Sequence, residues 1–152
     1  MNENLYLYIL MRSDLPSLST GRAAAQASHA SNAFIHQYGK NVDVIDWSRQ
    51  TTQGFGTAIV LSADLNEISE TLVDLRVGGF EVFDTITDPD YVVPISSELV
   101  PFLNNQDERI KVTFSGSEIY KAFLHRSEVT CAYVFGDKTK LAPFLSKFPL
   151  YS

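Results

Sequence analysis

Apolar residues occur in short runs that alternate with amphipathic stretches, a pattern typical of strands alternating with helices. The stretch from Leu5 to Met11 is apolar or aromatic at every position, which predicts a strand buried on both faces. The Ala-rich stretch from Arg22 to Tyr38 favours a helix. Ser19 or Thr20 is suited to cap its start, and Gly39 stands where such a helix would end.

The next part of the chain repeats this order. Residues 41–53, around Trp47, are polar and predict an irregular connection. Gly54 and Gly56 then lead into a second strand at residues 57–61. Further along, Gly78 and Gly79 end a second long helix, and residues 80–87 predict a third strand. That helix begins at a capping box, Asp64 with Glu67, and one of its faces carries Leu65, Ile68, Leu72 and Leu75.

The last part of the chain predicts one more strand and one more helix. Residues 129–135 are almost continuously apolar, as in a buried strand. Residues 137–147 favour a helix that Pro143 keeps short or breaks. The whole order predicts an α/β fold in a single domain, residues 1–152, with helices covering the sheet.

Residues 90–128 interrupt this order. They contain Pro94, Pro101 and a polar run, and are either an insertion with its own structure or a lid. Within them, residues 110–114 alternate as in a short strand, and residues 117–124 favour a helical turn or two.

Composition and charge narrow the classes of protein. The 152 residues are 45% apolar, enough for a packed core without a metal or disulfide. The single cysteine, Cys131, predicts a reducing compartment and hence the cytoplasm. The first apolar run is too short to span a membrane, and we expect no membrane partner. A net charge of −6 argues against a broad basic nucleic-acid surface but allows a small patch that grips a few phosphates.

Three side chains of the first predicted helix share one face, because Arg22, Gln26 and His29 follow the spacing i, i+4, i+7. This face begins where the first strand's loop arrives, and ligands of α/β sheets bind beyond the carboxyl ends of strands. A cation, an amide and an imidazole there would hold an anionic or ester substrate. The alternative is a solvated helix face with a structural histidine.

Asp88 follows the third predicted strand, and Thr130 lies in the fourth. If these two strands are neighbours, both side chains reach the mouth of the same cleft. A carboxylate there orients or deprotonates water, and a hydroxyl orients a carbonyl or a water. Each residue also has a plain structural reading, since Asp-Pro-Asp is a common turn and threonine a common strand residue.

Other chemistries lack their signatures. The Gly54-Phe55-Gly56 segment is not followed by the Lys-Ser/Thr of a phosphate loop. The three histidines lack metal-ligand spacing, so we expect no metal. A Gly-x-Ser-x-Gly elbow for Ser-His-Asp catalysis is also absent.

Taken together, these segments resemble the type-two peptidyl-tRNA hydrolases. That family has a strand ending in Arg-Thr-Asp-Leu and a helix beginning Gly-Lys-x-Ala-Ala-Gln-x-x-His-Ala. Here the chain has Arg12-Ser13-Asp14-Leu15, then Gly21-Arg22-Ala23-Ala24-Ala25-Gln26-Ala27-Ser28-His29-Ala30. The resemblance covers roughly residues 5–89 and 129–151, and its further landmarks are Trp47, Ala58-Ile59-Val60-Leu61, Asp88, Val129-Thr130-Cys131, Gly136 and Leu150-Tyr151.

The resemblance implies a mixed four-stranded sheet flanked by helices on both faces, with residues 90–128 inserted before the last core strand. It also implies cleavage of the ester between a peptide and the 3′ end of tRNA, without metal or cofactor, in a protein that is often a homodimer. Carried over by position, the catalytic residues are Arg22, Asp88 and Thr130, and the substrate-binding residues are Gln26, His29 and Arg12.

Three departures from the family motivate other functions. The loop at residues 16–20 lacks the family's lysines, Val92 replaces a threonine, and residues 90–128 are extra. One alternative is therefore an RNA- or protein-binding module that has lost the chemistry. Another is a hydrolase of small esters or amides, whose substrates carry little phosphate.

Overall fold

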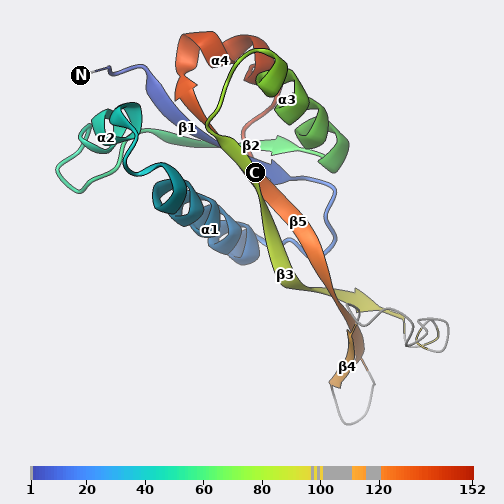
Figure 1. The fold of residues 1–152 in the computed structure, drawn as a ribbon. Coiled ribbons are helices and arrows are strands. Elements are labelled where there is room, and N and C mark those ends of the chain that lie inside the picture. The colour runs from blue at the N-terminus through green and yellow to red at the C-terminus, as the bar shows by residue number, and fades with distance from the viewer. Residues whose placement is uncertain (1, 97, 99, 101–110, 116–120) are drawn as a thin grey trace.

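The computed structural model describes residues 2–96, 98, 100, 111–115 and 121–152. Strands and helices alternate through most of the chain (Figure 1). In chain order they are β1 (Leu5–Arg12), α1 (Thr20–Tyr38), α2 (Val42–Ser48), β2 (Ala58–Ala63), α3 (Leu65–Val77), β3 (Phe83–Ile95), β4 (Lys111–Ser115), β5 (Lys121–Asp137) and α4 (Lys138–Leu145).

The strands form one mixed sheet in the order β2-β1-β5-β3, with β4 paired to the first half of β5. β1 is parallel to β2 and antiparallel to β5, which is in turn antiparallel to β3. β1, β2 and β3 therefore point the same way. β1 ends beside the middle of β5, where Met11 pairs with Cys131, whereas β3 continues along the first half of β5 until Ile95 pairs with Ala122. The predicted mixed α/β sheet is confirmed, with five strands where four were expected, because β4 adds to it.

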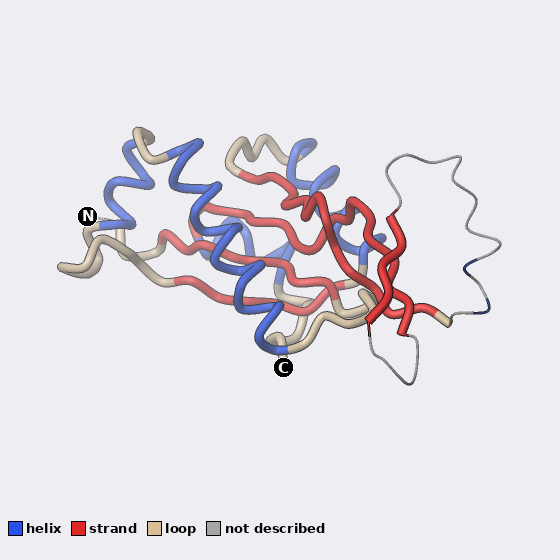
Figure 2. Tube along the Cα trace, turned by 90° about the horizontal axis from the view of Figure 1, so that it is seen from below, coloured by secondary structure: helices blue, strands red, loops and turns tan. Residues whose placement is uncertain are grey.

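The sheet has an apolar core on each face, which explains why β1 is apolar throughout. Leu7, Ile9 and Met11 pack with α1 and α2 on one face. Tyr8 and Leu10 pack with α3 and α4 on the other. Side chains of a strand alternate between faces, so a strand covered on both sides needs apolar residues at every position. Figure 2 shows α1, the long helix in front, crossing the strands at a slant on its side of the sheet.

Small residues let α1 approach the strands closely. Ala23 and Ala30 are 5% and 0% exposed, and Phe34 further along fills the space between sheet and α2. The ring of Phe34 lies 5.5 Å from that of Trp47 and 4.9 Å from that of Phe135. This packing fixes the angle of α1 and so the position of the polar side chains on its first two turns.

Two local predictions were wrong. Residues 42–48 form α2 within the stretch predicted to be irregular, since burial of Val44 and Trp47 stabilises a helix too short to show a clear period. Residues 121–124 belong to β5, where a helical turn was predicted; residues 116–120 lie outside the described part. Their pairing with β3 and β4 outweighs the local preference.

Within residues 90–128, the parts that the structure describes as strands extend the sheet. β3 continues to Ile95 and β5 begins at Lys121, so the two strands keep pairing well beyond the helix-covered part. β4, close to the predicted strand at residues 110–114, pairs with this same half of β5. Figure 1 shows the three strands projecting away from the helices. None of the helices formed by the described residues combines the length and apolar character that crossing a bilayer requires.

Candidate active site

A bulge in β5 turns two consecutive side chains toward α1. The pairing of β3 with β5 shifts between Ile86 and Thr87, so that Thr130 has no ladder partner. The extra residue places Thr130 on the same side as Cys131, where regular alternation would put it on the other. Thr130 Oγ1 donates a hydrogen bond of 2.7 Å to Gln26 Oε1, and Cys131 Sγ lies 3.7 Å from the Gln26 carbonyl oxygen.

The Gln26 amide, held by Thr130, in turn orients the carboxylate of Asp88. Gln26 Nε2 donates a hydrogen bond of 2.9 Å to Asp88 Oδ2. The backbone N–H of Asp90 donates to Asp88 Oδ1 at 2.9 Å. A second shift in the pairing, between Asp88 and Tyr91, leaves room for this turn, and Pro89, which has no N–H to donate, lies within it.

The three side chains differ in access to solvent. Thr130 is 0% exposed and Gln26 is 6% exposed, whereas Asp88 is half-buried. Because an ionised carboxylate only accepts hydrogen bonds, Asp88 takes the NH₂ end of the Gln26 amide, and Oε1 is left to accept from the Thr130 hydroxyl. The chain thus holds a carboxylate acceptor in one orientation at the surface, with the hydroxyl and amide behind it.

Arg22 projects from the first turn of α1 on the same face as Gln26. Its Nη1 donates to the carbonyl oxygens of Ser17, at 3.1 Å, and Val92, at 3.0 Å. Its guanidinium carbon lies 4.4 Å from the centre of the Tyr91 ring. Nε and Nη2 have no hydrogen bond to any residue that the structure describes, so this part of the fork can bind an anion.

Tyr91 stands among the charges of the site. The pKa of its hydroxyl is raised, mainly because the group is buried. The charges of Arg22 and Arg12 act to lower this pKa, and those of Glu128 and Asp88 act to raise it. Gln26, one turn of α1 after Arg22, binds Asp88 directly. Arg22 and Asp88, although far apart in the chain, belong to the same small region.

Arg12 lies at this edge of the sheet but has partners of its own. It is 7% exposed, and its Nε donates to Asp14 at 2.9 Å while its Nη1 donates to Glu128 at 2.6 Å and to the Val129 carbonyl at 3.0 Å. The hydrogen bond from Arg12 holds the pKa of Asp14 below its ordinary value. These contacts join β1 to β5, and we read Arg12 as support for the site.

Of the six residues expected at the site, Thr130, Gln26, Asp88 and Arg22 come together. His29 is exposed, and no hydrogen bond within the described part of the chain includes it. The sequence interpretation missed Tyr91, which it left in the supposed insertion. The alternation of Tyr91, Val93 and Ile95 was the available signal that β3 continues past the prolines.

A second polar cluster lies on the extension. His125 Nδ1 is 3.0 Å from Asp90 Oδ1, and His125 Nε2 is 2.8 Å from Thr113 Oγ1. The order carboxylate, imidazole, hydroxyl is that of a hydrolytic triad. However, Thr113 Oγ1 receives no further hydrogen bond from the residues described, and Asp90 is 66% exposed. We therefore interpret the cluster as a tie between β3, β5 and β4.

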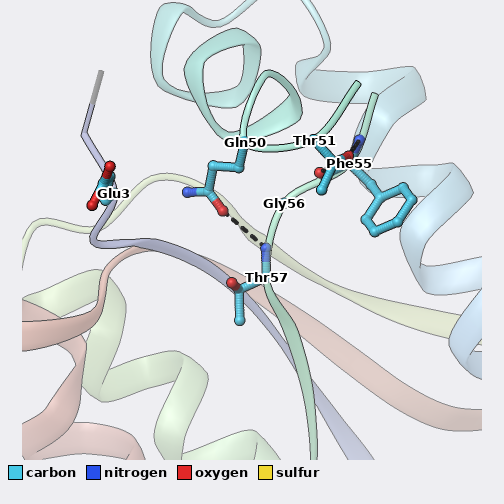
Figure 3. A pocket seen from close by; sticks show the side chains of 6 residues that line it. All are labelled: Glu3, Gln50, Thr51, Phe55, Gly56 and Thr57. Carbon is cyan, nitrogen blue, oxygen red and sulfur yellow. Dashed lines mark hydrogen bonds between the residues drawn. The ribbon is translucent and has the colours of Figure 1, made fainter. Parts of the chain in front are cut away.

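A pocket of about 420 Å³ lies at the opposite end of the sheet, beside the residues that precede β1 and β2. Figure 3 shows Gln50 Oε1 accepting from the Thr57 N–H, a bond of 3.0 Å. Gln50 Nε2 also donates to the Leu5 carbonyl, so its amide is already occupied. The remaining lining, Glu3, Thr51, Phe55 and Gly56, brings no second charge, and this pocket is distant from the candidate site. Nowhere in the described ranges do three His, Cys, Asp or Glu side chains gather as metal ligands would.

The family of the chain follows from a comparison with models of known protein families. The sequence model of the family described as peptidyl-tRNA hydrolase PTH2 matches residues 5–91. That range is more than half of the chain and runs from β1 to the site residue Tyr91. No curated protein matches the chain. The chain therefore belongs to the PTH2 family of peptidyl-tRNA hydrolases.

Proposed function

We propose that the protein is a peptidyl-tRNA hydrolase, which cleaves the ester between a peptide, or an N-blocked amino acid, and the 3′ end of tRNA. Membership of the PTH2 family supports this assignment. The observation that carries it is the hydrogen-bonded chain from Thr130 through Gln26 to Asp88. It presents an oriented carboxylate beside the cationic side chain of Arg22.

In the proposed reaction Asp88 acts on a water molecule. One carboxylate oxygen is held by Gln26 and the other by the Asp90 N–H, and both keep lone pairs for a further hydrogen bond. The carboxylate orients the water and takes its proton as the water oxygen attacks the ester carbonyl carbon. The bond from this carbon to the ribose oxygen then breaks, and the ribose oxygen receives the proton.

Arg22 supplies the positive charge. Its Nε and Nη2 bind the oxygen on which negative charge develops, or the phosphate next to the ester. An arginine keeps its proton at all working pH values, so its role is electrostatic. Thr130 was expected to be catalytic, but a side chain with 0% exposure does not reach a substrate, and we assign it a positioning role through Gln26.

The test is release of N-acetylated amino acid from charged tRNA. Asp88→Asn removes the proton acceptor and Arg22→Ala removes the charge, and each should lower kcat/KM about a hundredfold or more. Two variants control for generic effects. Asp84→Asn changes an exposed aspartate of the same strand. Arg76→Ala removes an arginine that lies 5.6 Å over the ring of Phe83, outside the site.

Both controls should keep wild-type rates. The proposal is overturned if the wild-type protein, at high concentration, releases no amino acid from charged tRNA. It is also overturned if Asp88→Asn is as active as the wild type.

The alternative is a binding module of the same fold that has lost the chemistry. The contacts of the loop at residues 16–20 favour it, since two of its carbonyls are bound by Tyr91 and Arg22 and no lysine is present to grip phosphate. It predicts that uncharged tRNA or a protein partner binds while charged tRNA stays intact. Cleavage of small esters without any response to tRNA would instead indicate a small-ester hydrolase.

A further inference from the structure

Tyr91 is fully buried, and its side chain contacts both the loop that leads into α1 and the Arg22 side chain. Its side chain has 0% exposure. Its hydroxyl donates a hydrogen bond of 2.7 Å to the Pro16 carbonyl, and the face of its ring lies under the Arg22 guanidinium at 4.4 Å. A buried tyrosine needs only one acceptor for its hydroxyl. The contact of its ring with Arg22 is therefore a second interaction, through which Tyr91 links the loop to the cation.

The loop that Tyr91 holds is strained at the next residue. Ser17 has φ of 64°, in the left-handed region that only glycine adopts freely. Its carbonyl oxygen accepts from Arg22 Nη1, and the neighbouring Pro16 carbonyl accepts from Tyr91. Two consecutive carbonyls of the loop are thus bound by the two side chains that stack on each other, which keeps the loop in this conformation.

The Arg22 side chain needs such support because it is long and has many rotamers. Its Nη1 is fixed by two carbonyls, one on the loop and one on β3. These bonds fix one nitrogen but leave the guanidinium plane able to turn about it. The ring of Tyr91 restrains this turning, because the guanidinium carbon lies over its face, 4.4 Å from the ring centre, where a cation and an aromatic ring attract each other. The orientation of Nε and Nη2 therefore depends on Tyr91.

We propose that Tyr91 is a positioning residue, which holds the Arg22 guanidinium in the orientation that the ester substrate requires and locks the loop at residues 16–20 against β3. This inference rests on the proposed function for its catalytic consequence. Its structural part, the orientation of Arg22, is independent of any activity. The two parts are tested by separate measurements.

The structural part is tested by the NMR resonance of the Arg22 Nε–H, assigned by its loss in Arg22→Lys. A ring face shifts the resonance of a proton above it. Tyr91→Phe keeps the ring and should keep the shifted resonance, whereas Tyr91→Leu should move it toward the position of a free arginine. Tyr133→Leu is the matched control, since Tyr133 is 1% exposed and donates its hydroxyl to Gln37 outside the site.

The catalytic part is tested by a double-mutant cycle in the charged-tRNA assay. Tyr91→Leu should lower kcat on the order of tenfold to a hundredfold, as for a misplaced catalytic group, with little change in KM. Tyr91→Phe should retain most of the rate. In the Arg22→Ala background Tyr91→Leu should cost nothing further, because the group that it positions is absent.

Each outcome decides the proposal. An Arg22 resonance that does not move in Tyr91→Leu overturns it, whatever the activity. Multiplying losses in the double variant, or an equal loss of rate in Tyr133→Leu, also overturn it, because they show a general loss of packing. If the wild type is inactive while the resonance moves as expected, the proposed function fails and the orientation of Arg22 by Tyr91 stands alone.

Discussion

At the scale of a residue, two buried threonines differ in whether their hydroxyl has a hydrogen-bond partner. Thr130 is 0% exposed, and its hydroxyl donates to Gln26. Thr71, on α3, is 1% exposed, and its hydroxyl has no partner among the described residues. Burying a hydroxyl costs free energy unless it is hydrogen-bonded, so we expect these two threonines to differ in their effect on stability.

The pair leads to a prediction for stability. Thr130→Val keeps the shape but leaves Gln26 Oε1 without its donor, so the free energy of unfolding should fall by about 1–3 kcal/mol. Thr130→Ser should restore much of this loss and of the activity. Thr71→Val should be neutral or stabilising. Urea unfolding measures all three, and equal losses in Thr130→Val and Thr71→Val would contradict the assigned role.

At the scale of elements, the site exists because strand ends are joined at one edge of the sheet. Arg12 at the end of β1 binds Asp14 in the following loop and Glu128 in β5. The same edge carries the loop from β1 into α1, whose first two turns supply Arg22 and Gln26. The ion pairs of Arg12 therefore hold the elements whose side chains converge.

This arrangement predicts how stability depends on pH. The pKa of Asp14 is lowered from its ordinary 3.8, first by the hydrogen bond from Arg12. Its contribution is therefore present above pH 3.8 and is lost as the pH falls through the lower, folded value. Asp14→Asn should be less stable than the wild type at neutral pH, and the difference should vanish in acid.

Urea unfolding between pH 2 and pH 7 measures this difference. Asp74→Asn on α3 is the control, since Asp74 is exposed and forms no ion pair within the described ranges. It should show no such dependence. A gap between Asp14→Asn and wild type that stays constant down to pH 2 would rule out the ion pair as its source.

At the scale of the whole molecule, the charge of −6 opposes RNA binding, so affinity depends on local contacts. The loop at residues 16–20 has no lysine to add to Arg22. Few phosphates are then neutralised, and few counterions are released on binding.

We therefore expect a shallow salt dependence. A plot of log KM for charged tRNA against log salt should have a slope of about 0.7 for each phosphate contacted, with one or two contacts in total. Steady-state kinetics between 50 and 200 mM salt measures it, and Arg22→Lys, which keeps the charge, is the matched control. A steep slope would indicate a larger phosphate-binding surface than this site contains.

Local patterns predicted much of the fold. The apolar run of β1, the capping box of Asp64 and Glu67, and the alanines of α1 each dictate a conformation through their own neighbours, and the structure has all three. The continuation of β3 to Ile95 was missed because Pro89 and Pro94 usually end a strand. A bulge accommodates Pro89, but only the partner strand reveals the bulge.

The sequence alone determined which side chains are available at the site. It also determined that the chain belongs to a peptidyl-tRNA hydrolase family. Finally, it determined the spacing that puts Arg22 and Gln26 on one helix face. Only the tertiary structure decided that Thr130 turns toward that face, because the turn results from one unpaired residue in the ladder between two strands. It likewise placed Tyr91 under Arg22, since contacts between distant segments depend on register and not on local preference.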